Sequence, residues 1–170
     1  AYIVEVEVDI RRGLPSFQTV GLPEAAVKES KDRVRSAINN SEYAFPDDRI
    51  TINLAPADIK KEGTAFDLPM AVGILAASGI VPRERLDEYL MMGELSLDGQ
   101  IKPVRGSLPV ALAARNSGLR GIILPKRNAH EAAVVNGIEV LPAPTLGKLV
   151  EFLCGLRPIQ PESINVQTIF

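Results

Sequence analysis

The sequence predicts an α/β protein of mixed-sheet, α+β character, and three observations support this fold class. Residues 2–10 alternate apolar and charged side chains, which is the pattern of a half-buried strand. Residues 68–77 are the most apolar stretch and predict a central buried helix. Residues 107–153 alternate helical and strand patterns, a rhythm typical of βαβα units with partly parallel strands.

The first half is predicted to open with a β-hairpin. Residues 2–10 form its first strand, residues 11–15 are turn material, and residues 17–20 pair back on the first strand. A helix then runs from Glu24 to about Asn39, because Pro23 and Glu24 suit a helix start. Its buried stripe comprises Val27, Val34 and Ile38, aided by Ala37. Residues 49–54 alternate as a third strand, which leads into the central stretch 53–79.

The second half is predicted to hold a second hairpin followed by alternating helices and strands. Asp98-Gly99 is a strong turn signal between residues 89–97 and residues 100–104. Helices are expected at 107–116, 128–135 and 145–153, with Ser107 as the cap of the first, and strands at 121–125 and 138–141. We expect one domain over residues 1–154 and a linker over residues 155–170, where Pro158 and Pro161 interrupt any helical period.

Composition narrows the classes of function. A formal charge of −2 over 170 residues creates no global field for polyanions, so nucleic-acid binding requires a local patch. The only cysteine, Cys154, and the only histidine, His130, exclude an internal disulfide and argue against a zinc site. We expect no metal, no cofactor and no membrane partner for this chain, and a cytoplasmic location. Because the chain begins without Met or a signal peptide, we expect it to be part of a longer protein.

The helix at 24–39 carries a cluster of basic side chains with two interpretations. Lys28, Arg33, Lys31 and Arg35 lie within eight positions. Carboxylates at i,i+4 compensate the first two, among them Glu29 for Arg33, and each pair contributes roughly 0.2–0.5 kcal/mol, so a solvated face is favoured over a phosphate-binding face. Only Lys31 and Arg35 are left without an expected partner inside the helix.

Nucleotide-binding loops are absent from the sequence. There is no GxxxxGK[ST] loop and no GxGxxG after a strand. His130 lies in a polar helix start and is predicted to be a solvated surface residue. Glu62 and Asp67 flank the loop before the central helix; we interpret Asp67 as the N-cap of that helix and Glu62 as an anion beside Lys60 and Lys61.

Two segments resemble the proteolytic domain of Lon proteases. The first reads KKEGTAFDLPMAVGILAA and is similar to the segment that holds the Lon nucleophile, an acidic residue followed by Gly-Pro-Ser-Ala-Gly and an apolar helix. The second reads MGELSLDGQIKPVRGSLPVALAA and resembles the segment that leads into the lysine-bearing helix of Lon. The resemblance covers residues 50–153 and implies a Lon proteolytic-domain-like fold.

The resemblance fails where the chemistry of a Ser/Lys dyad requires a hydroxyl and an amine. Counting from Gly63, the nucleophile position falls on Ala65, and counting from Gly106, the lysine position falls on Leu108. Thr64 lies one residue early. We therefore expect no catalytic residue and no enzyme activity in this chain.

The whole chain resembles the N-terminal domain of the ComM/YifB family of magnesium-chelatase-like AAA+ ATPases. The residues that carry this resemblance read VEVDIRRGLPSFQTVGLPEAAVKESKDRVRSAI and NLAPADIKKEGTAFDLPMAVGILAASG. It implies a cytoplasmic bacterial ATPase and DNA helicase that forms a homo-oligomeric ring on DNA and promotes branch migration in natural transformation. It also implies that ATP and Mg²⁺ belong to an AAA+ domain that follows this chain and is its partner.

Three functions therefore stand as expectations. The favoured one is a non-catalytic Lon-like domain that serves ring assembly and DNA contact, and the alternatives are a degenerate peptidase that uses Thr64 and a protein-interaction module. If nucleic acid is contacted, the candidate side chains are Lys60, Lys61, Arg11, Arg12, Lys31 and Arg35.

Overall fold

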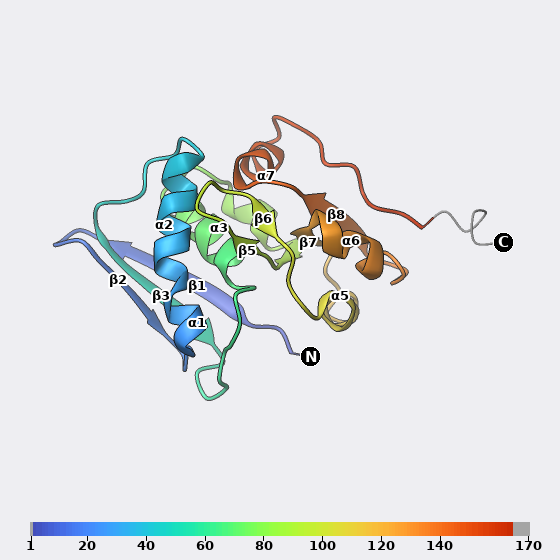
Figure 1. Cartoon of the computed structure of the whole chain (residues 1–170), viewed down its shortest axis with the longest axis horizontal. Helices are drawn as coiled ribbons and strands as arrows, with labels where there is room; N and C mark the ends of the chain where they lie inside the picture. The colour runs from blue at the N-terminus through green and yellow to red at the C-terminus, as the bar shows by residue number, and fades with distance from the viewer. Residues whose placement is uncertain (1, 165–170) are drawn as a thin grey trace.

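Two three-stranded sheets lie on either side of a central helix in this computed structural model, which describes residues 2–164 (Figure 1). Residues 165–170, part of the expected linker, lie outside the described residues. The mixture of parallel and antiparallel pairs, with helices packed on the sheets, confirms the predicted α/β, α+β class.

The first sheet has the order β1-β3-β2, which corrects the predicted hairpin. β1 (Glu5–Arg11) pairs antiparallel and β2 (Ser16–Val20) pairs parallel with β3 (Arg49–Ala55), which lies between them. β3 occupies the central position of the sheet because its inward-facing residues are all apolar and are buried. These residues are Ile50, Ile52 and Leu54. The loop at residues 12–15 is long enough to cross about 10 Å, the width of two strand spacings.

Two helices replace the single one predicted at 24–39. α1 (Ala25–Lys28) ends at Glu29, and α2 (Ser30–Asn40) continues from there along the sheet. The predicted stripe is confirmed, because Val27, Val34, Ala37 and Ile38 are all buried.

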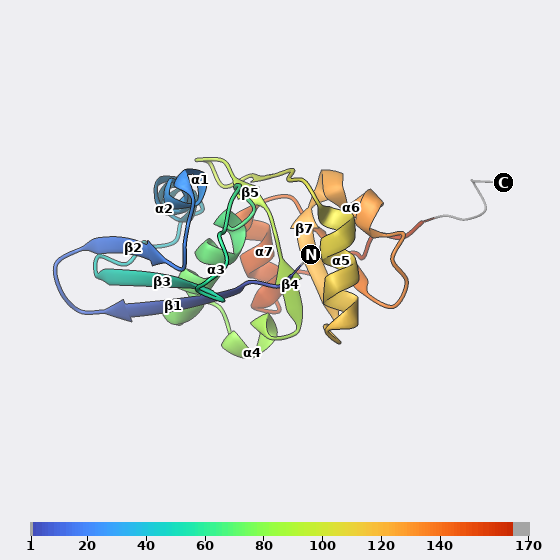
Figure 2. The same cartoon turned by 90° about the horizontal axis from the view of Figure 1, so that it is seen from below.

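The central helix α3 (Asp67–Ala77) is buried on nearly all sides, as its composition predicts. It contacts β1, α2 and β5, and it lies between the two sheets (Figure 2). α4 (Arg83–Leu86) follows as a single turn.

The second sheet is parallel, with the order β4-β7-β8. Its strands are β4 (Tyr89–Met91), β7 (Gly121–Pro125) and β8 (Glu139–Ala143), and the helices beside it are α5 (Ser107–Asn116), α6 (Lys126–Ala132) and α7 (Leu146–Leu153). This arrangement confirms the predicted βαβα rhythm.

The predicted turn at Asp98-Gly99 is confirmed, but the strand before it is interrupted. β5 (Glu94–Leu95) and β6 (Ile101–Lys102) pair antiparallel across the turn. The predicted strand at 89–97 breaks at Gly93, because its N–H donates to the Ala65 oxygen and its C=O accepts from the Leu68 N–H. The chain thus leaves the sheet to bind the loop before α3.

Candidate functional site

The loop at residues 62–66 joins the first sheet to α3 and lies where a nucleophile would stand in a Lon-like fold. Gly63 has the left-handed φ of +82°, which turns the chain sharply before the helix. Gly93 then holds the loop through two backbone hydrogen bonds of 3.0 Å, to Ala65 and Leu68. The backbone of the loop is therefore fixed by contacts with the segment that follows β4.

Ala65 lies in the loop before α3, and Leu108 lies in the first turn of α5. Both side chains pack against the same apolar cluster, which includes Met92, Ile122 and Leu124. Hydrocarbon side chains can neither attack a carbonyl nor accept a proton. The two positions that a dyad would occupy therefore contribute to apolar packing.

The structure corrects the interpretation of Asp67 as a helix N-cap. The N-cap position is Phe66, and Asp67 is the first residue inside α3, with its carboxylate fully buried. The carboxylate accepts hydrogen bonds from Ser30 Oγ at 2.6 Å and from the Leu95 N–H at 3.0 Å. Its charge therefore links α3 with α2 and β5 instead of capping its own helix.

Arg33 neutralises this buried carboxylate. Its Nε and a terminal nitrogen donate to the two Asp67 oxygens at 2.7 Å and 3.0 Å. The hydrogen bond to Asp67 raises the pKa of Arg33, against the opposing effect of burial. Arg33 thus pairs across the fold, and the i,i+4 pair predicted with Glu29 does not form among the described residues.

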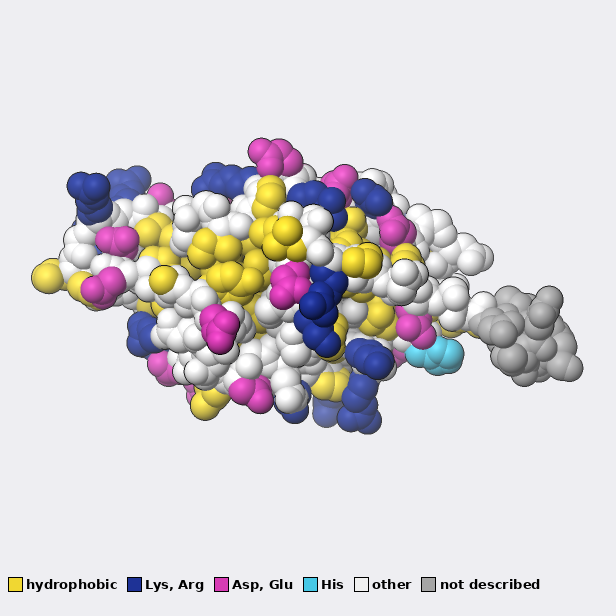
Figure 3. Space-filling view, turned by 90° about the horizontal axis from the view of Figure 1, so that it is seen from above, with side chains coloured by type: hydrophobic (Ala, Val, Ile, Leu, Met, Phe, Trp, Pro, Cys, Tyr) yellow, Lys and Arg dark blue, Asp and Glu magenta, His cyan; other side chains and the backbone are white. Residues whose placement is uncertain are grey.

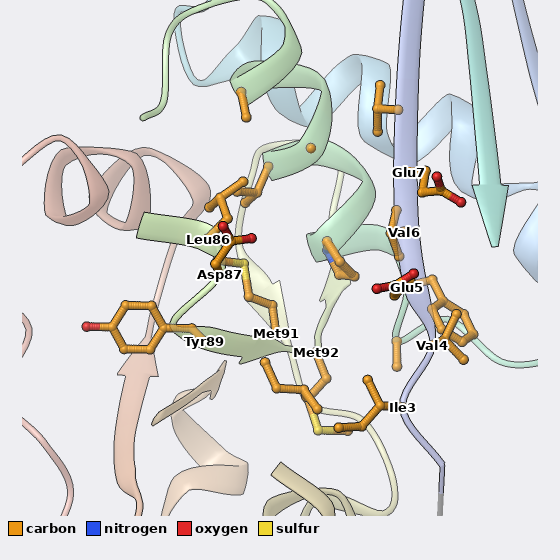
Figure 4. Close-up of a pocket in the computed structure, with 18 of the residues that line it drawn as sticks. Ile3, Val4, Glu5, Val6, Glu7, Leu86, Asp87, Tyr89, Met91 and Met92 are labelled. Carbon is orange, nitrogen blue, oxygen red and sulfur yellow. The ribbon is translucent and has the colours of Figure 1, made fainter. Parts of the chain in front are cut away.

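A groove of about 820 Å³ runs beside Ala65 between the two sheets. Figure 4 shows β1 along one side and Met91 and Met92 of the β4 segment along the other. Both β1 and β4 are edge strands of their sheets, and the floor consists of α3 residues that include Pro69 and Val72. Such a groove suits an extended peptide, which adds to a free strand edge through its main chain.

Lys60 and Lys61 have opposite environments. Lys61 is 1% exposed, and its ammonium group donates to the carbonyl oxygens of Gly21 and Pro56. It is therefore withdrawn from the surface, which corrects its prediction as a nucleic-acid contact. Lys60 is 79% exposed and lies 3.9 Å from Glu24. The predicted pairing of Glu62 with these lysines does not occur in the described part of the chain.

The other predicted cations lie on β1, in the β1–β2 loop and on α2. Arg11 Nε lies 2.9 Å from Asp9 in the edge strand β1, and the Arg35 guanidinium lies over the ring of Phe45 at 5.2 Å. Arg12 is exposed in the β1–β2 loop, and Lys31 is exposed on α2. All these cations and Lys60 are exposed, and their role in nucleic-acid contact stays a prediction.

The sequence did not predict the environments of two buried polar side chains, Asn128 and Ser107. Asn128 is buried at the start of α6 and binds both backbone groups of Val104, which no local pattern announces. Ser107, predicted as a cap, is itself the first residue of α5 after Gly106, and its hydroxyl is buried without a partner among the described residues. His130 is 80% exposed, as predicted.

The fold and the two apolar dyad positions define the class of protein, a Lon-like domain that lacks the Ser/Lys dyad. Lon protease 2 of Bacillus subtilis is 27% identical over 141 residues, which cover 82% of this chain and 25% of that protein. No helix in residues 2–164 is long and apolar enough to cross a membrane.

The chain belongs to the family described as subunit ChlI of Mg-chelatase, whose profile matches residues 6–128. Competence protein ComM of Haemophilus influenzae is 48% identical over 171 residues, covering 99% of this chain and 33% of ComM. YifB of Escherichia coli K12 is 48% identical over 157 residues, covering 92% of this chain and 31% of YifB. The chain therefore spans about a third of the length of these relatives.

Proposed function

We propose that this chain is the non-catalytic Lon-like domain of a cytoplasmic, magnesium-chelatase-like AAA+ ATPase that remodels DNA. The observation that carries the proposal is the retained nucleophile loop with hydrocarbon side chains at both dyad positions, Ala65 and Leu108. The similarity to a competence protein over nearly the whole chain supports a role in natural transformation, and we propose branch migration as that role. ATP and Mg²⁺ act in the AAA+ domain. The Lon-like domain contributes to ring assembly and DNA contact.

The test compares the full-length protein with a version that lacks residues 1–154. We expect the complete protein to sediment as a ring with ATP, to hydrolyse ATP faster with DNA, and to move branched DNA junctions. Removal of the domain lowers assembly and junction movement while the AAA+ domain still binds ATP. Equal assembly and equal junction movement without the domain would overturn the proposal.

A degenerate peptidase is the enzymatic alternative, with Thr64 as the nucleophile. Thr64 lies one residue before the nucleophile position, Ala65, and a Thr nucleophile needs a general base beside it. Incubation of the chain with an unfolded protein substrate tests this function. Cleavage that Thr64→Val abolishes would establish the peptidase, whereas cleavage that survives Thr64→Val would exclude Thr64.

A peptide-docking module is favoured by the groove between the two edge strands. Its acidic side chains, among them Glu5, Glu7 and Asp87, suit a segment that carries basic residues. Sedimentation of the chain, alone and joined to its AAA+ domain, separates self-assembly from docking of a different partner. Concentration-dependent self-association of the isolated chain would favour assembly over docking.

A further inference from the structure

We propose that four cations at the junction of α5 and α6 form a binding surface for the sugar–phosphate backbone of nucleic acid. This inference rests on the proposed DNA-remodelling function and gives its DNA contact a location. The surface, called here the α5–α6 basic patch, consists of Lys102, Arg105, Lys126 and Arg127.

A buried asparagine holds the two halves of the patch together. Asn128 Oδ1 accepts from the Val104 N–H at 3.0 Å, and its Nδ2 donates to the Val104 oxygen at 2.7 Å. Lys102 and Arg105 lie within two residues of Val104, and Lys126 and Arg127 directly precede Asn128. Residues separated by more than twenty positions are thereby fixed side by side, and α5 and α6 lie together in both views of the fold (Figures 1 and 2).

All four side chains are exposed and uncompensated by direct ion pairs. None of them pairs with a carboxylate in the part of the chain that the structure describes, in contrast to Arg11 and Lys60. Three acidic groups lie close in the fold or along the chain: Glu94 stands opposite Lys102 across the β5–β6 pair, Asp98 feels the charge of Lys102, and Glu131 follows Arg127 at i,i+4 in α6. Figure 3 shows Lys and Arg side chains beside the single histidine, which belongs to α6.

The first turn of α5 adds neutral donors to this surface. α5 has ten residues, and no side chain caps its N-terminus. Gly106 has a φ of +84°, with no atom within 4 Å of the place where a Cβ would stand, so a ligand can approach the backbone. The backbone N–H groups of Ser107 and Leu108 open the helix, where free N–H groups favour phosphate, whereas the third residue, Pro109, has no N–H to offer.

The chemistry of the patch selects the nucleic-acid backbone instead of the bases. Guanidinium and ammonium groups bind phosphate oxygens, and no aromatic side chain belongs to the patch to stack on bases. A chain with a net charge of −2 attracts polyanions only through such a local concentration of charge. Binding should therefore be independent of sequence and strongly salt-dependent.

The experiment measures binding of the chain to a mixed-sequence single-stranded DNA oligonucleotide over a range of salt concentrations. The patch variant should bind more weakly, and its slope of log affinity against log salt should be shallower by about 2 to 3, because each lost phosphate contact removes about 0.7. The unfolding midpoint of the variant serves as the check on folding. The patch variant combines Lys102→Gln, Arg105→Gln, Lys126→Gln and Arg127→Gln.

A control variant of equal charge change separates a local contact from a general effect of charge. It combines Lys28→Gln, Arg83→Gln, Arg115→Gln and Arg157→Gln, and its affinity and slope should stay near those of the wild type.

Three results would overturn the inference. Wild-type affinity and slope in the patch variant would remove the patch as the contact. Loss of binding only on substitution of Arg11, Arg12, Lys31, Arg35 and Lys60 would place the contact on the other surfaces. Absence of DNA binding by the wild-type chain and by the full-length protein would remove the proposed DNA function itself. A patch variant that binds DNA as the wild type does would remove only the patch and would leave that function intact.

Discussion

Lys61 contributes to the fold through both parts of its side chain. Its hydrocarbon stem is buried, and its ammonium group links Gly21, just after β2, with Pro56, just after β3. A buried cation is tolerated here because carbonyl dipoles replace the water it loses. The Lys61 side chain therefore holds in place the loop that precedes Ala65.

We predict that Lys61→Ala destabilises the protein whereas Lys60→Ala does not. Loss of the buried stem and of both hydrogen bonds should lower the free energy of unfolding by roughly 2–3 kcal/mol. Lys60 is 79% exposed, so its loss should stay within about 0.5 kcal/mol. Urea denaturation of both variants measures the difference, and equal stabilities would contradict the role assigned to Lys61.

The ion pair of Asp67 and Arg33 is the second residue-scale feature with a large expected effect. Asp67→Asn leaves Arg33 without its anion inside the fold and weakens the bond to the Leu95 N–H. Removal of one partner of a buried pair should lower the free energy of unfolding by about 3 kcal/mol. Chemical denaturation checks this, with Asp58→Asn as an exposed control expected within about 0.5 kcal/mol of the wild type.

At the scale of elements, Gly73 sets how closely α3 approaches β1. A Cβ at this position would lie 2.8 Å from Val8 Cγ2, and the neighbouring strand cannot move away without disturbing its pairing with β3. Glycine weakens a helix by about 1 kcal/mol relative to alanine, so its presence here reflects packing.

We predict that Gly73→Ala destabilises the protein by about 1–3 kcal/mol, because the clash outweighs the gain in helix propensity. Adding Val8→Ala should recover part of this loss, since it removes the clashing methyl groups. Gly147→Ala in α7 is the matched control; it meets no atom within 4 Å and should be neutral or stabilising. A double-mutant cycle measures the coupling, and purely additive effects would contradict the contact.

The β5–β6 turn should respond to pH in a defined direction. The hydroxyl of Ser96, and then the Gln100 N–H, donate to Asp98 and lower its pKa from 3.8. A lowered pKa in the folded state means that the stabilisation is present above the unfolded pKa and is lost as pH falls through the folded pKa. Asp98→Asn should therefore reduce the acid dependence of stability below about pH 4, as measured by thermal unfolding at several pH values. An unchanged acid profile would contradict this.

At the scale of the molecule, one apolar core joins the two sheets. The larger cluster includes Ile50 and Leu54 of β3, Leu75 of α3, Ile123 of β7 and Leu141 of β8. Neither sheet can leave this core without exposing α3, so the two halves depend on each other.

We predict a single cooperative unfolding transition, with far-ultraviolet circular dichroism and tyrosine fluorescence following the same curve. Leu75→Ala should shift both signals together and lower the free energy of unfolding by about 2–5 kcal/mol. Separate midpoints for the two signals would show that the sheets unfold independently.

The sequence by itself determined most of the elements and the family, while the tertiary structure decided the partners of each element. Alternation at 2–10 and 49–54, the apolar helix after Asp67 and the Asp98-Gly99 turn reflect local burial and backbone preferences, which a sequence records directly. The insertion of β3 between β1 and β2, the pairing of Asp67 with Arg33, the burial of Lys61 and the clamp of Asn128 on Val104 join residues far apart in the chain. Burial patterns show which face of an element is covered but not by what, and for that reason neither these contacts nor the α5–α6 basic patch could be foreseen.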